Sequence, residues 1–231
     1  MDKTTDKPTT KSLPLWDIWI RLFHWSLAIS VGFMLLSGET GFGFFEWHRL
    51  VGEIVLCLVL FRVLWSIFGS SNASLIALIK SPNAAVLHLK ELFTRTVRPE
   101  PGHNAAGGWA VLAVLVLLAI QAITGFFIAD EDEFIEGAFY DSIDTDLSYL
   151  MYDIHHTVAT FIQIIVAVHI IAILSYWIWA KLNLIPAMIS GRQKWPDELD
   201  RETIVWQPFW KGLLCLAASV AIIGTLAGWF S

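Results

Sequence analysis

The stretch that decides the fold is residues 154–180, IHHTVATFIQIIVAVHIIAILSYWIWA, which contains no Lys, Arg, Asp or Glu. A helix of this length, rising about 1.5 Å per residue, can cross the roughly 30 Å hydrocarbon core of a bilayer. Ionisable side chains are costly inside such a span, so its histidines are candidates for a functional site. His155 and His169 lie about 21 Å apart along the axis with an offset of only about 40°, so they share one face. His156 is offset from His169 by roughly 140° and points elsewhere.

Four more apolar blocks predict four more spans. They cover residues 20–36, 47–68, 108–129 and 209–230. The composition agrees, because 56% of the residues are hydrophobic and 16% are charged, against about a quarter charged in soluble domains. The fifth span has no His, Asp, Glu or Arg after Lys211, which favours a lipid-facing helix. We therefore expect an all-α integral membrane protein with a four-helix bundle and a fifth, C-terminal transmembrane helix.

Two more histidines lie at the mouths of spans, His24 in the first and His48 in the second. Since successive spans alternate in direction, depth pairs His24 with His169 and His48 with His155. Two imidazoles at one depth on facing helices suit the iron of a porphyrin, which needs only two axial protein ligands. A bare zinc or copper ion would require three or four ligands at one level. Histidines that only form packing hydrogen bonds, in a structural or ion-conducting membrane protein, remain the alternative.

Loop charges predict the orientation. Basic residues are frequent before the first span, between residues 69 and 107 and between residues 181 and 211. Residues 38–48 and 130–153 contain no Lys or Arg. The positive-inside rule places the N-terminus in the cytoplasm and the C-terminus outside. Residues 1–14 are interpreted as a polar, disordered cytoplasmic leader, because a cleaved signal peptide fits them poorly.

Other polar residues have weaker roles in this scheme. Arg21 and Arg62 on the cytoplasmic side, and Arg49 on the outer side, are candidates to bind haem carboxylates, although Arg62 can also be interpreted as a snorkelling arginine. His88 is expected to be solvated on an interfacial amphipathic helix. His103, with the adjacent asparagine, is a candidate for a quinone site or for a helix cap.

The two cysteines, Cys57 and Cys215, lie far apart in apolar blocks, which indicates buried, inert thiols. The sequence contains no CxxCH motif, so it offers no attachment signal for a c-type haem.

Several motifs resemble one known family. Residues 16–25, WDIWIRLFHW, are similar to the W-D-x-x-x-R-x-F-H-W opening of the bacterial dihaem b-type cytochromes, which include cytochrome b561 and the cytochrome b subunits of nickel–iron hydrogenases. Residues 48–52 (HRLVG) and 60–65 (LFRVLW) resemble the second helix of that family. Residues 102–108, GHNAAGG, resemble its G-H-N-P-x-G-G motif, with Ala105 in place of proline.

The resemblance covers roughly residues 14–195 and implies a four-helix core in the bacterial inner membrane. It implies two haems b, with iron ligands from the first, second and fourth helices, matching His24, His48, His155 and His169. The expected organisation is a leader of residues 1–14, a dihaem cytochrome b domain of residues 15–195, and a linker with a further helix in residues 196–231.

The predicted function is electron transfer by a subunit, rather than catalysis by an independent enzyme. Nine carboxylates in residues 130–153 predict a negative patch beside the outer haem that attracts a periplasmic cytochrome c or another redox protein, such as a hydrogenase-like enzyme. Quinone in the bilayer is the expected partner on the other side, and nothing suggests nucleic acid. The alternative is a stand-alone, quinone-linked oxidoreductase acting on a small species such as superoxide, which the negative patch would repel.

Overall fold

The computed structural model describes residues 10–40, 45–100, 102–130, 135–196 and 203–230. Within these ranges, five helices are long and apolar enough to cross a membrane. They are α1 (Ile18–Thr40), α2 (Phe45–Phe68), α4 (Ala105–Gly125), α5 (Thr145–Leu174) and α7 (Phe209–Leu226). The expected helical membrane bundle is confirmed.

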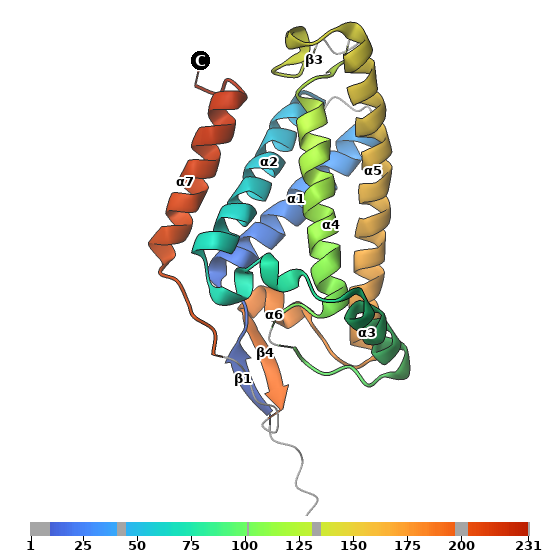
Figure 1. The fold of residues 1–231 in the computed structure, drawn as a ribbon, viewed down its shortest axis with the longest axis vertical. Helices are drawn as coiled ribbons and strands as arrows, with labels where there is room; N and C mark the ends of the chain where they lie inside the picture. The colour runs from blue at the N-terminus through green and yellow to red at the C-terminus, as the bar shows by residue number, and fades with distance from the viewer. Residues whose placement is uncertain (1–9, 41–44, 101, 131–134, 197–202, 231) are drawn as a thin grey trace, which may run out of the picture.

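The helices stand side by side with their axes roughly along the long dimension of the molecule (Figure 1). Helix α1 packs mainly on α2, and α5 packs mainly on α4, while α2 and α4 join the two halves. Helix α7 packs on α2. The four-helix core thus consists of two helix pairs, and the histidines of interest come from both of them.

The two ends of the bundle carry different short elements, most of which are labelled in Figure 1. At one end, strand β1 (Thr10–Pro14) pairs antiparallel with β4 (Arg192–Pro196), beside α3 (Pro82–Thr94) and α6 (Ile185–Ser190). We call this the ribbon end. At the other end, β2 (Ala129–Asp130) pairs with β3 (Ile135–Glu136), and we call this the hairpin end. The 3-10 turns Ser71–Ala73 and Ile76–Leu78 lie between α2 and α3, and Tyr140–Ser142 precedes α5.

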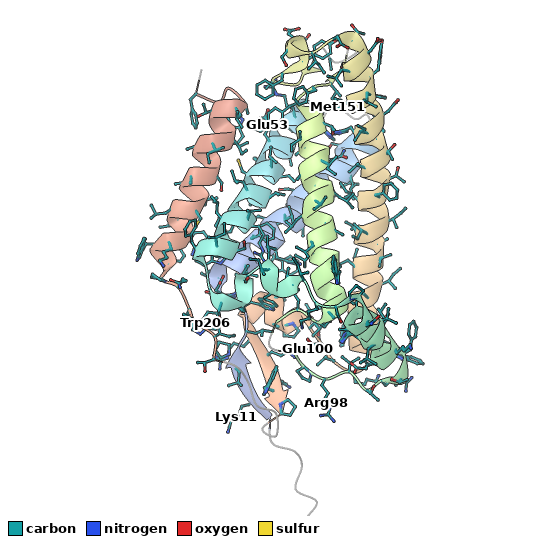
Figure 2. All side chains as sticks on the ribbon, viewed as in Figure 1. Lys11, Glu53, Arg98, Glu100, Met151 and Trp206 are labelled. Carbon is teal, nitrogen blue, oxygen red and sulfur yellow. The ribbon has the colours of Figure 1, made fainter. Side chains whose placement is uncertain are left out.

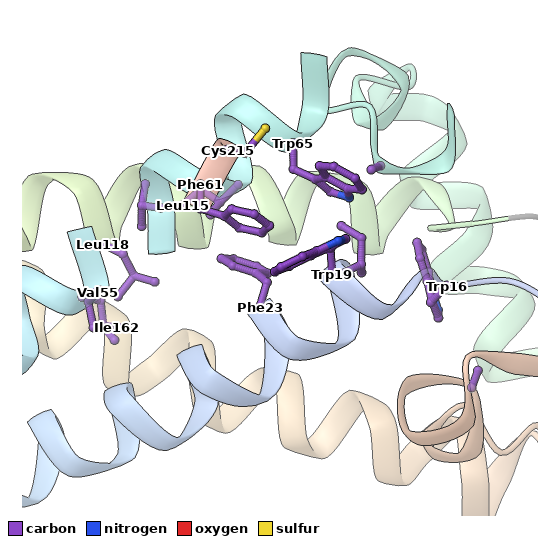
Figure 3. Packing of buried hydrophobic residues seen from close by; sticks show 14 of the residues in the cluster. Trp16, Trp19, Phe23, Val55, Phe61, Trp65, Leu115, Leu118, Ile162 and Cys215 are labelled. Carbon is purple, nitrogen blue, oxygen red and sulfur yellow. The ribbon is translucent and has the colours of Figure 1, made fainter. Parts of the chain in front are cut away.

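The core at the ribbon end is aromatic. Trp19 and Phe23 of α1 lie against Phe61 and Trp65 of α2, and Trp65 is fully buried (Figure 3). The indole nitrogen of Trp65 donates to Asp17 Oδ2 at 3.1 Å, which satisfies the polar end of this large side chain. These contacts fix the first helix against the second at the level of His24.

Side-chain caps decide where helices begin. Asp17 Oδ1 accepts from Ile20 N at 2.8 Å, and Asp144 Oδ1 accepts from Leu147 N at 2.9 Å. Asn104 caps α4 in the same way. Helices α4 and α5 therefore begin earlier than the expected residues 108 and 154, because the caps lie in polar sequence upstream of the apolar blocks.

Helix α7 is tied to the core by specific contacts. Trp19 Nε1 donates to Phe209 O at 3.1 Å, and Trp229 Nε1 donates to Glu53 Oε2 at 2.5 Å. Figure 2 labels Glu53 between α2 and α7 near the hairpin end. A Cβ on Gly212 would lie 2.1 Å from Trp19 Cε2, so only glycine allows this approach. The helix expected to face lipid therefore also has one face fixed on the core.

The interpretation of residues 1–14 as a disordered leader is wrong for its last part. Residues 10–14 form strand β1, paired in register from Thr10 with Pro196 to Pro14 with Arg192. The sequence around residues 10–14 gives no local sign of this pairing, because the partner strand β4 comes after all four core helices in the chain. Residues 1–9 lie outside the described part of the chain.

Candidate functional site

Four histidines form two pairs at the two ends of the core. The ring centres of His24 (α1) and His169 (α5) lie 6.4 Å apart, with planes tilted by 53°. The ring centres of His48 (α2) and His155 (α5) also lie 6.4 Å apart, with planes tilted by 57°. The structure thus brings together the same partners that depth and facing predict from the sequence. In each histidine pair, one ring comes from α5 and the other comes from α1 or α2.

Hydroxyl groups orient both rings at the hairpin end. Ser37 Oγ lies 2.9 Å from His48 Nδ1, and it donates to Met34 O at 3.2 Å. Thr124 Oγ1 lies 3.0 Å from His155 Nδ1 and is 2.9 Å from Ile120 O. Each hydroxyl has a backbone carbonyl within donating distance, so we assign its hydrogen to that carbonyl and the ring proton to Nδ1 of the imidazole. Nε2 of each ring is then the nitrogen able to coordinate a metal.

A cavity of about 310 Å³ opens between the rings of His48 and His155. Small residues line it, and any added side chain would fill the space. A Cβ on Gly38 would lie 3.4 Å from His48 Cε1, and a Cβ on Gly125 would lie 3.4 Å from His155 Cε1. Gly52 lines the same cavity. Glycine at these points leaves room for a flat group beside the imidazoles.

At the ribbon end, the polar atoms are less completely paired. Within the described residues, Nδ1 of His24 and Nδ1 of His103 are buried and have no hydrogen-bond partner. Arg62 is only 2% exposed, and its Nη1 donates to Ala73 O at 2.7 Å. His103 packs against Trp16 with ring centres 4.7 Å apart. Buried donors that lack a partner normally mark a place for a further polar group.

The three arginines occupy different surroundings. Arg62 is buried, so the snorkelling interpretation does not describe it. Arg21 donates from Nη1 to Ile189 O at 2.6 Å near the ribbon end. Arg49 lines the cavity at the hairpin end, while its Nε pairs with Glu53 Oε1 at 2.9 Å. The guanidinium of Arg49 thus already has protein partners.

His103 is held neutral by its surroundings. Burial is the largest cause, followed by the nearby positive charges of Arg62 and Lys80, and together they lower the pKa of His103 to about 3. The adjacent Asn104 caps α4, accepting from Gly107 N at 2.7 Å. The cap interpretation is therefore correct for Asn104.

His156 and His88 belong to neither of the two histidine pairs. His156 is exposed and packs on Tyr152 with ring centres 4.2 Å apart, and it also contributes to the lining of the hairpin-end cavity. The expectation that His88 is solvated is wrong, because its side chain is 5% exposed and its Nε2 lies 2.5 Å from Tyr176 Oη. The sequence signal that was missed is Tyr176, which falls seven residues after His169 and so lies near the same face of its helix.

Comparison with known proteins adds one finding. The model of the family described as prokaryotic cytochrome b561 matches residues 15–191. The matched range begins with the cap of α1 and ends beyond α6, so it includes all four paired histidines and leaves out α7. The comparison with curated proteins gave no match.

Proposed function

Because the chain belongs to the prokaryotic cytochrome b561 family of membrane electron carriers, we propose that it holds two haems b and passes electrons between membrane quinone and a redox protein at the hairpin end. Membership in this family makes the chain a multi-pass membrane b-type cytochrome. The number of haems, their ligands and the partners are the proposal.

The observation that carries the proposal is the separation of the histidine rings. Two imidazoles bound to one metal from opposite sides, each at about 2 Å with its ring centre about 1.1 Å further back, would have centres roughly 6.2 Å apart. Both pairs measure 6.4 Å. Packed rings elsewhere in the bundle lie between 4.2 Å and 6.5 Å apart, so the separation supports coordination because it recurs for a pair of imidazoles at both ends of the core. The residues present therefore fit haem iron at each end.

Haem supplies an iron that accepts and releases single electrons. The residues of the chain do the rest: His24 and His169 would hold one group, and His48 and His155 the other. Ser37 and Thr124 would orient the second pair through Nδ1, which raises the basicity of the coordinating nitrogen. The buried Arg62 and the neutral His103 offer donors to carboxylates at the ribbon end, and Arg21 and Arg49 are the further candidates.

The loop charges favour the ribbon end in the cytoplasm of a bacterial cell and the hairpin end, with the C-terminus, in the periplasm. At the hairpin end, the described acidic side chains include Glu136, Asp141, Asp146 and Asp153. They add to the acidic residues at 130–133, which lie outside the described side chains. A basic periplasmic cytochrome c is therefore the favoured partner, because opposite charges steer association.

Two measurements test this function. Purified protein should contain two haems b per chain by the pyridine haemochrome assay, and quinol should reduce them. A content of one haem, or none, would contradict the dihaem assignment.

Oxidation of the reduced protein by a basic cytochrome c should slow steeply as salt is added, because the steering is electrostatic. The double substitution Asp141→Asn with Asp146→Asn should slow it further, while oxidation by an uncharged quinone serves as the matched control and should not change. If superoxide instead reduces the haems rapidly and no cytochrome c reacts in a salt-dependent way, the protein is a stand-alone oxidoreductase.

A further inference from the structure

A buried histidine outside the two pairs lies in a hydrogen-bonded chain at the ribbon end. His88 of α3 is 5% exposed, and its Nε2 lies 2.5 Å from the hydroxyl oxygen of Tyr176, with the two rings stacked at 5.9 Å. Tyr176 belongs to the π-helical turn Ser175–Trp179 that ends α5. Single π-helical turns are rare and often accompany function. Packing alone would place an apolar side chain at position 88, so the polar contact needs an explanation.

The other nitrogen of His88 faces carboxylates that reach water. His88 Nδ1 lies 3.4 Å from Glu100 Oε1 and 3.6 Å from Glu91 Oε2. The side chains of Glu100 and Glu91 are 32% and 41% exposed. Glu100 also pairs with Lys80 at 2.8 Å, and Figure 2 labels Glu100 beside α3 at the ribbon end. One side of the imidazole is therefore in contact with groups that exchange protons with solvent.

The inner side of the chain leads toward the first histidine pair. Tyr176 Oη accepts from Asn104 Nδ2 at 3.0 Å, and Asn104 is adjacent to His103. Tyr176 follows His169 by seven residues, which places it about 10 Å further along the axis and near the same face. His103 in turn lies close enough to His24 and His169 for their charges to act on it.

Both nitrogens of His88 can exchange a proton along this chain. When the ring is neutral, Nδ1 donates toward the carboxylates and Nε2 accepts from the tyrosine hydroxyl. When the ring is charged, both nitrogens donate, and the hydroxyl oxygen accepts from His88 as well as from Asn104. The two states differ by a rotation of the Tyr176 hydroxyl hydrogen, which is directed to His88 Nε2 when the ring is neutral and away from it when the ring is charged.

We propose that His88, Tyr176 and the carboxylates of Glu91 and Glu100 form a proton-exchange site that takes up one proton from water at the ribbon end when the adjacent haem gains an electron. The inference rests on the proposed function, since it requires a haem at His24 and His169. Reduction of a haem held by His24 and His169 would add negative charge, and the His88 network would take up the proton that compensates it. Oxidation of the haem returns the proton to water through the same carboxylates.

In the described part of the chain, the contacts of His88 bring three titratable groups against its ring. Glu91 comes from its own helix, Glu100 from the segment before α4, and Tyr176 from the end of α5. Lys80 acts through its ion pair with Glu100. A reduced haem adds negative charge, which favours the protonated network, and therefore the midpoint potential should fall as the pH rises.

The test is a redox titration of the intact protein, followed by haem absorbance at several pH values. In the wild type, the component assigned to His24 and His169 should have a midpoint potential that falls with pH, by at most about 59 mV per pH unit for one proton and one electron. His88→Gln should remove most of this slope and leave the haem spectrum unchanged. Tyr176→Phe removes only a hydroxyl and should reduce the dependence of the midpoint potential on pH. This variant provides the test if His88→Gln does not fold.

Controls separate this inference from the proposed function. Lys90→Gln changes an exposed charge on α3 and should leave the slope intact. The infrared difference spectrum between reduced and oxidised protein should contain histidine or tyrosine bands that disappear in the two variants. A pH-independent potential in the wild type, or an unchanged slope in both variants, overturns the proton-exchange site while leaving the haem assignment standing. Absence of haem would instead refute the proposed function, and it would be evident from the spectrum before any titration.

Discussion

Thr124 Oγ1 lies 3.0 Å from His155 Nδ1, from which it accepts a hydrogen bond, and its own hydroxyl donates to the α4 backbone at Ile120 O or Gln121 O. One hydroxyl therefore fixes both the orientation of the imidazole and the identity of its protonated nitrogen. Ser37 holds His48 in the same way from α1. The hairpin-end pair is thus preorganised by two different helices, whereas Nδ1 of His24 at the ribbon end has no partner within the described residues.

Removing either hydroxyl should raise the midpoint potential of the hairpin-end haem. A hydrogen bond at Nδ1 makes the imidazole a stronger electron donor and favours oxidised iron, so Thr124→Val or Ser37→Ala loses about 1 kcal/mol of that preference. Redox titration measures the shift, and haem content should stay at two. Ser66→Ala is the matched control, because its hydroxyl contacts only Val63 O near the end of α2. A fall in potential would contradict this account.

The ligand pairs can be separated by substitution. His24→Ala and His169→Ala should each remove the same spectroscopic component, and His48→Ala and His155→Ala should each remove the other. The measurements are haem stoichiometry and the low-temperature absorption spectrum of each variant. His156→Ala should retain both haems, since its exposed ring stacks on Tyr152. Loss of one shared component in His24→Ala and His48→Ala would refute the pairing.

The attachment of α7 depends on Gly212. Its Cβ position lies 2.1 Å from Trp19, so Gly212→Leu should displace α7 and cost about 1–3 kcal/mol of stability. Ala217→Leu, on the exposed side of the same helix, is the control and should have little effect. Thermal unfolding followed by circular dichroism measures the difference. Both variants should still bind haem, because α7 supplies none of the paired histidines; haem loss in Gly212→Leu alone would contradict this.

His103 should make stability depend on pH. The pKa of His103 is about 3 in the folded protein, because of burial and then the charges of Arg62 and Lys80, against about 6.5 for an unperturbed histidine. Between these values the unfolded chain binds the extra proton, so the free energy of unfolding decreases as the pH falls. Lowering the pH from 7.5 to 5 should cost about 2 kcal/mol through this one group.

His103→Gln should therefore show a flatter dependence than the wild type in thermal unfolding over this pH range. The equivalent substitution of the exposed His156 is the control and should follow the wild type. Equal slopes in the wild type and His103→Gln would show that His103 is not the group responsible.

The sequence predicted the transmembrane helices well, because long apolar blocks report directly on burial in lipid. It also predicted the partners His24 with His169 and His48 with His155, since depth and helical phase depend only on residue spacing. It could not predict that the hydroxyls of Ser37 and Thr124 contact these rings, because each hydroxyl lies on a different helix from the histidine that it contacts.

The errors have a common physical origin. His88 lies in an amphipathic segment, and its burial depends on contact with Tyr176, 88 residues later. Strand β1 depends on β4 in the same manner, and Arg62 is buried by the turn that contains Ala73. Local periodicity carries no information about which distant segment will cover a polar side chain.

The pairing of β1 with β4 has a consequence for biosynthesis. Strand β1 precedes the four core helices in the chain and its partner β4 follows them, so their backbone pairing cannot form until α5 and α6 have been made. Because β4 precedes α7, this pairing does not depend on that helix. Folding intermediates that lack β4 should therefore expose the start of α1 to proteases.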